Sequence, residues 1–438
     1  MNAKLTSEGS DGQPESERRW LASFAQLAAG ESVSTVLRLL SIVVVARRLG
    51  TDRFGIASLG IVIGGYLAVV AHSGLDIGGT RAIAEQRQRA REELADIVGL
   101  RVALGITAFV ATSVITALVP LRTETRFVVI GLAFTVVTNA LDIRWAFVGL
   151  QQTRSVALAS SISALWYLGG TLLFVRGTLG LAAFVGVHLS ADLLSAAVQW
   201  TASRRLIGAW WPRRSSKERL RELYCQSISI TVARSARTVM ITLDVLLVKV
   251  FRPEMEVGQY ALAGRIIATG ITYIGLYYHA YFAALARAKD DFDLVDRLMA
   301  TARRRVAMVG PPALVLMVVA APVAIRTVFG VEWNGTIGLL QAMLPSLLCL
   351  AVTGVYSQAL FAYGEQRVMA RIALTVMVVN IAANLALLPT VGTVGASIAT
   401  DVAEAVMVVL TIVAARKLPA VRHARAKPIV ASPGGHDL

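Results

Sequence analysis

The stretch IVGLRVALGITAFVATSVITALVP, residues 97–120, contains a single charged side chain, Arg101. A helix that rises 1.5 Å per residue needs about 20 mainly apolar residues to cross the hydrocarbon core of a bilayer, which is roughly 30 Å thick. Working outward from this stretch, windows of similar length predict twelve membrane-spanning helices. They are expected at residues 25–46, 54–76, 97–120, 127–149, 156–175, 179–201, 226–250, 258–284, 306–329, 336–362, 368–389 and 392–415.

The composition of the whole chain agrees with this prediction. Of 438 residues, 55% are hydrophobic and 16% are charged, whereas soluble proteins carry about 25% charged residues. An ordinary soluble enzyme is therefore unexpected, and so is a disordered chain, because disordered chains are poor in apolar residues. The sequence predicts an all-α integral membrane protein.

The net charge of +15 is explained by membrane topology rather than by nucleic-acid binding. With the N-terminus inside, 28 of the 43 Lys and Arg residues fall in the tails and inner loops, and seven fall in the outer loops. Cytoplasmic loops are enriched in Lys and Arg. We therefore expect a multi-pass protein of the cytoplasmic (inner) membrane with both termini cytoplasmic. The expected segments are a tail (1–24), a six-helix lobe (25–201), a basic linker (202–225), a second six-helix lobe (226–415) and a tail (416–438).

Short matches between the two halves support an internal repeat. Phe54-Gly55 matches Val257-Gly258, and both pairs open a predicted helix. At an offset of 215 residues, Gly149 matches Gly364, and Gly177-Thr178-Leu179-Gly180 matches Gly392-Thr393-Val394-Gly395. Because six is an even number of helices, both lobes enter the membrane from the same side. This predicts a pseudo-two-fold axis along the membrane normal and transport by alternating access.

Charged residues inside the predicted spans are the candidate site. Such residues usually face a polar cavity or a partner because lipid disfavours them. Arg234, Arg237 and Asp244 fall on one stripe of the seventh helix at 100° per residue. Together with Arg38 and Arg265, the two arginines of this stripe form a predicted anion site, since guanidinium groups stay charged and donate in a fork to phosphate oxygens.

Other readings of these charges remain open. Arg234 or Arg237 could neutralise Asp244 or Glu31 and hold helices together. Two drives for transport fit the sequence, the membrane potential and a proton or sodium ion bound at Asp244, Asp142 or Glu31. Residues nearer the predicted membrane edges are expected to reach the headgroups instead. They are Arg101, Arg144, Arg326, Trp166, Tyr167, Trp210 and Trp211.

The sequence lacks the motifs that are typical of catalysis and cofactor binding. The sequence has no Walker A motif, no zinc-ligand spacing and only two cysteines, Cys225 and Cys349. We therefore expect no catalytic residues, no metal, no cofactor and no nucleic-acid partner.

Several segments together resemble the bacterial oligosaccharide flippases of the Wzx type. The N-terminal half carries ARRLGTDRFG at residues 46–55, followed by Gly74-Leu75-Asp76 and Gly79-Thr80-Arg81. The C-terminal half is still more similar to this family. It carries NIAANLALLP at residues 380–389, then Gly392, Gly395-Ala396-Ser397 and Glu404. The similarity extends over nearly the whole chain, from about residue 25 to 415.

This resemblance implies twelve helices in two lobes and a substrate of undecaprenyl-pyrophosphate-linked oligosaccharide. It places Arg38 and Arg265 on the helices where such proteins handle the pyrophosphate. The chain would be a flippase without enzymatic activity, serving exopolysaccharide, capsule or O-unit export. Its expected partners are the lipid-linked oligosaccharide, membrane lipids and membrane proteins of polymer synthesis.

Two other functions fit the same sequence features. A cation-coupled multidrug exporter of the same superfamily would have the same span count, but would be expected to use acidic rather than basic cavity residues. A scaffold of an envelope-synthesis complex would use the basic loop 202–225 and would not need the arginines in the spans.

Overall fold

The computed structural model describes residues 15–72, 74–212, 216, 218, 219, 221, 223, 225, 242–419 and 421. Within these residues every regular element is a helix. Eight of the helices in this part of the chain are long and apolar enough to cross a membrane. The expected all-α membrane architecture is therefore confirmed.

The helices fall into two compact units. The first unit comprises Met1–Leu49 and Gly60–Ser235, and the second comprises Gly50–Leu59 and Ala236–Leu438. The first unit holds most of α1 (Glu15–His72) and then α2 (Leu75–Glu85), α3 (Ala90–Leu118), α4 (Thr123–Ala133), α5 (Thr135–Ala140), α6 (Arg144–Gly149), α7 (Thr153–Phe174) and α8 (Gly180–Ile207).

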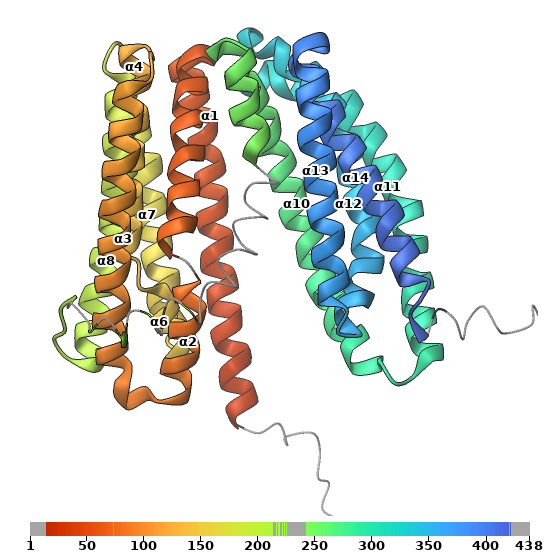
Figure 1. Cartoon of the computed structure of the whole chain (residues 1–438), viewed down its shortest axis with the longest axis horizontal. Coiled ribbons are helices and arrows are strands. Elements are labelled where there is room, and N and C mark those ends of the chain that lie inside the picture. Colours follow the sequence, from red (N-terminus) through yellow and green to blue (C-terminus); the bar gives the residue numbers. More distant parts are fainter. Residues whose placement is uncertain are drawn as a thin grey trace, which may run out of the picture. The chain divides into compact units, whose positions relative to one another are not determined.

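The second unit contains a helical segment at residues 242–251 and five longer helices. They are α10 (Glu254–Ala288), α11 (Phe292–Val328), α12 (Asn334–Ala362), α13 (Gln366–Val391) and α14 (Thr393–Ala415). Within this unit α12 packs against α10, α11 and α14, and α13 packs against α14 (Figure 1).

The first two predicted spans join into one kinked helix. The kink lies at Gly50, whose φ of 72° and ψ of 176° are non-helical. A positive φ is readily adopted only by glycine, so this residue lets α1 bend where a loop at 47–53 was expected. The sequence after the bend, Gly50–Leu59, belongs to the second unit.

Each unit has its own apolar core. In the first unit the core gathers around Leu94, Ile97 and Phe147. In the second it gathers around Leu285, Met299 and Leu360. Large apolar side chains also cover outward surfaces, such as Val315, Leu316 and Val319 on α11, which are more than 60% exposed. Exposed apolar faces of this extent mark a surface that contacts lipid.

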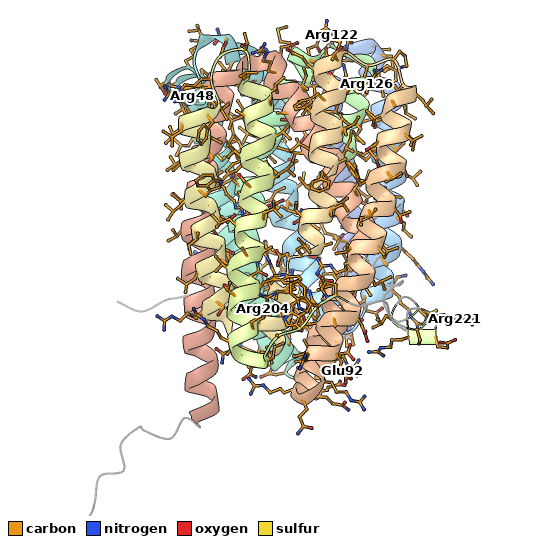
Figure 2. The ribbon with its side chains drawn as sticks, turned by 90° about the vertical axis from the view of Figure 1, so that its left-hand side faces the viewer. Arg48, Glu92, Arg122, Arg126, Arg204 and Arg221 are labelled. Carbon is orange, nitrogen blue, oxygen red and sulfur yellow. The ribbon has the colours of Figure 1, made fainter. Side chains whose placement is uncertain are left out.

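Charged side chains gather at the two ends of the first unit. Figure 2 shows Arg48, Arg122 and Arg126 at one end, and Glu92, Arg204 and Arg221 at the other. The helices between these ends carry mostly apolar side chains (Figure 2). This distribution is the one expected of helices that cross a bilayer.

The repeat predicted from sequence has a structural counterpart in the turns before α8 and α14. Gly177 and Gly392 both have positive φ values, 59° and 82°. In each turn the backbone N–H three residues later, in Gly180 or Gly395, donates to the carbonyl of this glycine. The two turns, which lie 215 residues apart, therefore share the same backbone geometry.

The proposed match between Gly149 and Gly364 is wrong. The residue with positive φ that corresponds to Gly364 (79°) is Gln151 (59°), two positions after Gly149. In both turns the residue after the positive-φ residue donates its backbone N–H across the helix end, from Gln152 to Phe147 and from Glu365 to Leu360. The structural offset at this turn is thus 213 residues.

Trp210 and Trp211 do not behave alike. Trp210 is 2% exposed and belongs to the core of the first unit, and its indole N–H donates to Ser203 Oγ at 2.9 Å. Trp211 is 67% exposed and lies against the guanidinium of Arg204 at 4.7 Å. The interface role expected for Trp210 is therefore wrong, as it is for the buried Tyr167.

Candidate functional site

The first unit contains a polar cavity of about 330 Å³. Its walls come from α1, from the segment around α5 and α6, and from α7 and α8. Every lining side chain is polar or charged. The lining consists of Ser34, Arg38, Asn139, Asp142, Arg144, Ser160, Ser163, His188, Asp192 and Ser195.

The cavity lies where the fourth predicted span is broken. This span was expected to run unbroken over residues 127–149, but it consists of α4, α5 and α6, with non-helical backbone at residues 142 and 143. Asn and Asp residues compete with the helical backbone for hydrogen bonds, and Asn139 and Asp142 flank this break. Irregular backbone within a membrane protein is tolerated where it is buried or lines a polar cavity.

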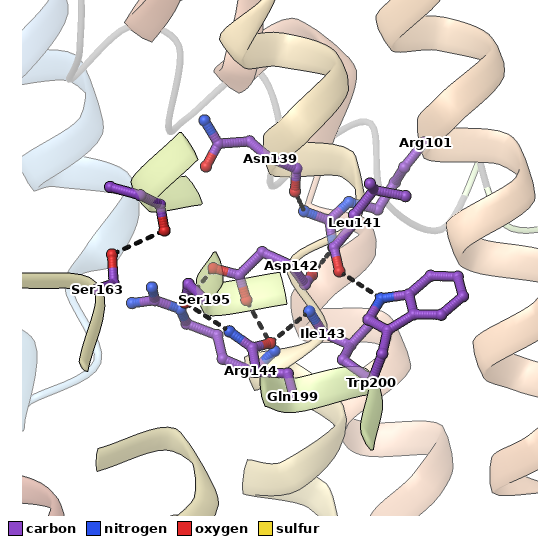
Figure 3. A network of polar contacts seen from close by, with 11 residues as sticks. Arg101, Asn139, Leu141, Asp142, Ile143, Arg144, Ser163, Ser195, Gln199 and Trp200 are labelled. Atoms are coloured by element: carbon purple, nitrogen blue, oxygen red, sulfur yellow. Dashed lines mark hydrogen bonds and ion pairs between the residues drawn. The ribbon is translucent and has the colours of Figure 1, made fainter. Parts of the chain in front are cut away.

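Side chains from two neighbouring helices satisfy the backbone groups freed by the break (Figure 3). Arg101 of α3 donates to the carbonyl oxygens of Asp142 at 2.8 Å and Asn139 at 2.9 Å. Trp200 of α8 donates to the carbonyl of Leu141 at 2.9 Å, and Gln199 Oε1 accepts from the N–H of Ile143 at 2.8 Å.

Arg101 thus has a different role from the one expected. It is 3% exposed and does not extend toward lipid headgroups, so that prediction is wrong. The helix break gives the physical reason, because carbonyl groups that lose their helical partners need donors in a buried environment. A guanidinium can supply two of them at once.

The charges that line the cavity are nearly balanced. Arg144 Nε lies 2.9 Å from Asp142 Oδ2, and the backbone N–H of Arg144 also donates to Asp142 Oδ1. Asp192 Oδ2 accepts from Thr138 Oγ1 at 3.1 Å. Arg38 is exposed, which places this cation at the rim of the cavity. Asp142 therefore has a compensating cation beside it.

A second polar centre lies in the second unit around Asp244. The side chain is 5% exposed and accepts hydrogen bonds from three helices. Its Oδ2 accepts from Tyr260 on α10 at 3.2 Å and from Thr400 on α14 at 2.8 Å. Its Oδ1 accepts from Asn384 Nδ2 on α13 at 2.9 Å.

Within the described residues, the hydrogen-bond partners of Asp244 are neutral, and one acceptor beside it has no donor. Asn384 is fully buried and gives its Nδ2 to Asp244 and to Asn380. Within the described part of the chain, Asn384 Oδ1 has no hydrogen-bond partner. A buried carboxylate next to an unsatisfied amide oxygen forms an oxygen-rich centre suited to a small cation.

Arg265 lies in the second unit on α10. It is half-buried, with its guanidinium 5.3 Å from the centre of the Phe54 ring. Phe54 is itself held edge-on against Trp333 at 5.2 Å. The ring of Phe54 therefore helps to position the guanidinium of Arg265.

Three predicted site residues have no side-chain description. Arg234 and Arg237 lie outside the described residues, and only the backbone of Glu31 is described, as part of α1. Arg38 belongs to the first unit and Arg265 to the second. The convergence of the four arginines on one anion remains a prediction.

Several residues of these centres were missed by the sequence interpretation. Arg101 and Gln199 support the helix break, whereas Asn384 and Thr400 surround Asp244. One signal was available for the second pair. Asn380, Asn384 and Thr400 are polar residues within otherwise apolar spans, and such residues usually face an interior partner.

Comparisons with known proteins agree with this architecture. The family profile described as "Polysaccharide biosynthesis protein" matches residues 21–287, more than half of the chain. No curated protein sequence matches the chain.

Solved structures of similar fold are transporters. A multidrug resistance MATE family transporter of the MOP superfamily, in its inward-facing conformation, has a TM-score of 0.72 at 15% identity, over 92% of this chain and 100% of that one. The lipid II flippase MurJ, inward closed, has a TM-score of 0.73 at 14% identity, over 90% and 88%. A MOP superfamily transporter from Pyrococcus furiosus, described as having a binding pocket of reverse polarity, has a TM-score of 0.57 at 14% identity, over 95% and 100%. At these identities the likeness shows a shared fold.

Proposed function

Because the chain belongs to the polysaccharide biosynthesis protein family, we propose that it is a flippase for undecaprenyl-pyrophosphate-linked oligosaccharides. It moves the sugar headgroup across the cytoplasmic membrane by alternating access and leaves the polyprenyl chain in lipid. No bond of the substrate is made or broken, so the protein is a transporter and not an enzyme. The product serves exopolysaccharide, capsule or O-unit assembly.

The polar cavity at the broken fourth span carries this proposal. A lipid-linked oligosaccharide combines a long apolar tail with a headgroup that is costly to place in hydrocarbon. A protein that moves it needs a polar compartment within an otherwise apolar bundle. The cavity of the first unit provides one, lined by ten polar side chains and held open by the contacts that support residues 141–143.

The pyrophosphate is held by Arg38 and Arg265, with Arg234 and Arg237 contributing from the seventh helix. Guanidinium groups remain charged at every physiological pH and form paired hydrogen bonds to phosphate oxygens. Arg38 is exposed at a cavity rim, and Arg265 is half-buried beside Phe54. Both guanidinium groups are therefore placed where a ligand can reach them.

Energy for transport comes from a cation that binds at Asp244. The carboxylate is buried and its described hydrogen-bond partners are neutral, so a proton or sodium ion bound there would neutralise its negative charge. Asp142 is less suited to this task because Arg144 already neutralises it. The side chain of Glu31 is not described, and this residue is kept as a secondary candidate.

The transporter is placed in the inner membrane with both termini in the cytoplasm, as the distribution of Lys and Arg predicts. Its ligands are the lipid-linked oligosaccharide and membrane lipids, and its partners are membrane proteins of polymer synthesis. The basic linker 202–225 then lies on the cytoplasmic side.

Complementation of polymer export tests the proposal. A cell that lacks the gene is expected to lose its polymer, and Arg38→Ala or Arg265→Ala should fail to restore it at normal protein levels. Arg81→Ala is the matched control, because Arg81 is exposed and pairs with the exposed Glu85. If Ala variants at all four arginines export the polymer normally, the proposed role of these arginines in pyrophosphate binding is refuted. Drug resistance on overexpression without any polymer defect on deletion would instead establish the multidrug exporter.

A further inference from the structure

The polar cavity in the first unit has the size of a small-ligand site. Its volume of about 330 Å³ lies at the lower end of the 300–1,000 Å³ range of ligand pockets. That space corresponds to about ten water molecules. It is large enough for one or two sugar rings, but not for a whole oligosaccharide.

The charges in this cavity do not favour an anion. Asp142 is compensated by Arg144 at 2.9 Å, which leaves Asp192 as the acidic group of the wall and Arg38 as the basic group of the rim. A phosphate placed deep in the cavity would approach the carboxylates of Asp142 and Asp192, and like charges repel. A phosphate at the rim would meet the exposed guanidinium of Arg38. The deep part of the cavity therefore suits an uncharged ligand.

Hydroxyl and amide groups make up most of the remaining wall. Ser163 Oγ donates to the carbonyl of Ala191 at 2.9 Å, so its lone pairs remain able to accept. Ser195 Oγ accepts from Gln199 Nε2 at 3.1 Å, so its own hydrogen remains able to donate. Figure 3 shows these two serines together with Asn139 and the Asp142–Arg144 pair, and all five residues line the cavity.

This mixture of groups matches sugar hydroxyls. Each hydroxyl of a sugar donates one hydrogen bond and accepts others, so it needs donors and acceptors side by side. The cavity wall contains both kinds, with carboxylates and an amide that can each engage more than one group, and several serine hydroxyls. The supporting contacts from Arg101 and Trp200 to the backbone at residues 139–142 hold these groups in place before a ligand arrives, which lowers the cost of binding.

We propose that this cavity is a sugar subsite that holds one or two uncharged sugar residues next to the pyrophosphate. Asp192 and Asn139 bind sugar hydroxyls in the interior, and Arg38 at the rim binds the pyrophosphate. The inference rests on the proposed flippase function and assigns its headgroup selectivity to the first unit. Specificity for the first sugars is therefore separate from recognition of the anion.

Binding of two matched lipids tests the subsite. The full-length protein in nanodiscs is titrated with undecaprenyl pyrophosphate and with the same lipid carrying the producing cell's own oligosaccharide. Wild type is expected to bind the sugar-bearing lipid about tenfold more tightly or better, since unpaired polar groups in the cavity disfavour the sugar-free lipid. Asp192→Asn keeps the side-chain shape and should reduce this preference at least about threefold.

Three further variants separate the contributions. Ser163→Leu fills the cavity and should abolish the preference while the Kd of the sugar-free lipid stays unchanged. Arg38→Ala should weaken binding of both lipids by the same factor. Glu92→Gln, at an exposed position on α3, should behave as wild type. Monodispersity and helical content of each variant are measured first, and the Asp192→Asn result decides the question if Ser163→Leu does not fold.

The outcomes distinguish the two proposals. If wild type binds both lipids equally, or if Asp192→Asn weakens both to the same extent, the sugar subsite is refuted and the flippase function stands. If wild type binds neither lipid, the proposed function fails together with the subsite.

Discussion

Gly55 on α1 and Gly258 on α10 pack backbone against backbone. A Cβ on Gly55 would lie 2.0 Å from the carbonyl oxygen of Glu254, and one on Gly258 would lie 2.0 Å from that of Thr51. The two glycines hold equivalent positions in the Phe54-Gly55 and Val257-Gly258 match. Both glycines belong to the second unit, so this close contact lies within it.

Gly55→Ala should therefore be strongly destabilising. The added methyl group would clash with backbone atoms, which cannot rotate away as a side chain does, and we expect a loss of about 3 kcal/mol or more. Unfolding by SDS titration in mixed micelles measures this. Gly65→Ala on the same helix, where no atom lies within 4 Å of the added Cβ, should leave the transition unchanged. Equal transitions for the two variants would contradict the close approach.

Arg101→Met should destabilise the first unit, although methionine fits a membrane helix well. The substitution removes the donors of two buried carbonyl oxygens, at a cost of about 1–3 kcal/mol for each. Arg326→Met serves as the control, because Arg326 is exposed and donates to Asn334. Its effect should be within about 0.5 kcal/mol. A stability of Arg101→Met equal to that of wild type would show that the helix break does not need this residue.

Trp210 and Trp211, which are adjacent in the linker, allow a third comparison of two substitutions. Trp210→Ala should cost about 3–5 kcal/mol, because it empties a fully buried position. Trp211→Ala should cost about 1 kcal/mol, the value of an exposed contact between a cation and an aromatic ring. Thermal unfolding of the purified variants compares them. Similar losses for both would contradict the burial of Trp210.

Asp244→Asn should uncouple transport from its ion gradient. The amide keeps the shape of the side chain but lacks the charge that a cation would neutralise. We expect vesicles that contain this variant to show no acceleration by a sodium or proton gradient, while exchange without a gradient continues. Asp290→Asn, exposed in the loop between α10 and α11, should respond as wild type. An unchanged response of Asp244→Asn to both gradients would exclude it as the coupling site.

The overall architecture was predictable because membrane helices leave a clear signal. About 20 apolar residues between polar loops define a span, and eleven of the twelve predicted spans overlap extensively with described helices. The seventh is described only from residue 242 onward. The break after α5 was not predicted, because it contains no proline or glycine. It is stabilised by Arg101, Gln199 and Trp200, which reach it from other helices.

The candidate site was predictable only in part, for the same physical reason. A charge inside a span indicates an interior position but does not identify its partner. Arg38 lines a cavity, whereas Arg101 donates hydrogen bonds to backbone carbonyl groups. A hydropathy pattern does not distinguish these two roles. Asp244 was selected for its helical stripe, yet the partners that the structure describes are residues of α10, α13 and α14.

The most direct measurement is translocation of a labelled headgroup by the purified protein. Proteoliposomes are loaded with undecaprenyl pyrophosphate that carries a fluorescent oligosaccharide, and an impermeant quencher reports which leaflet holds the sugar. Wild type should move the label between leaflets, and Arg38→Ala and Arg265→Ala should do so at least about tenfold more slowly. A wild-type rate no faster than that of protein-free vesicles, or equal rates in wild type and both arginine variants, would contradict the account.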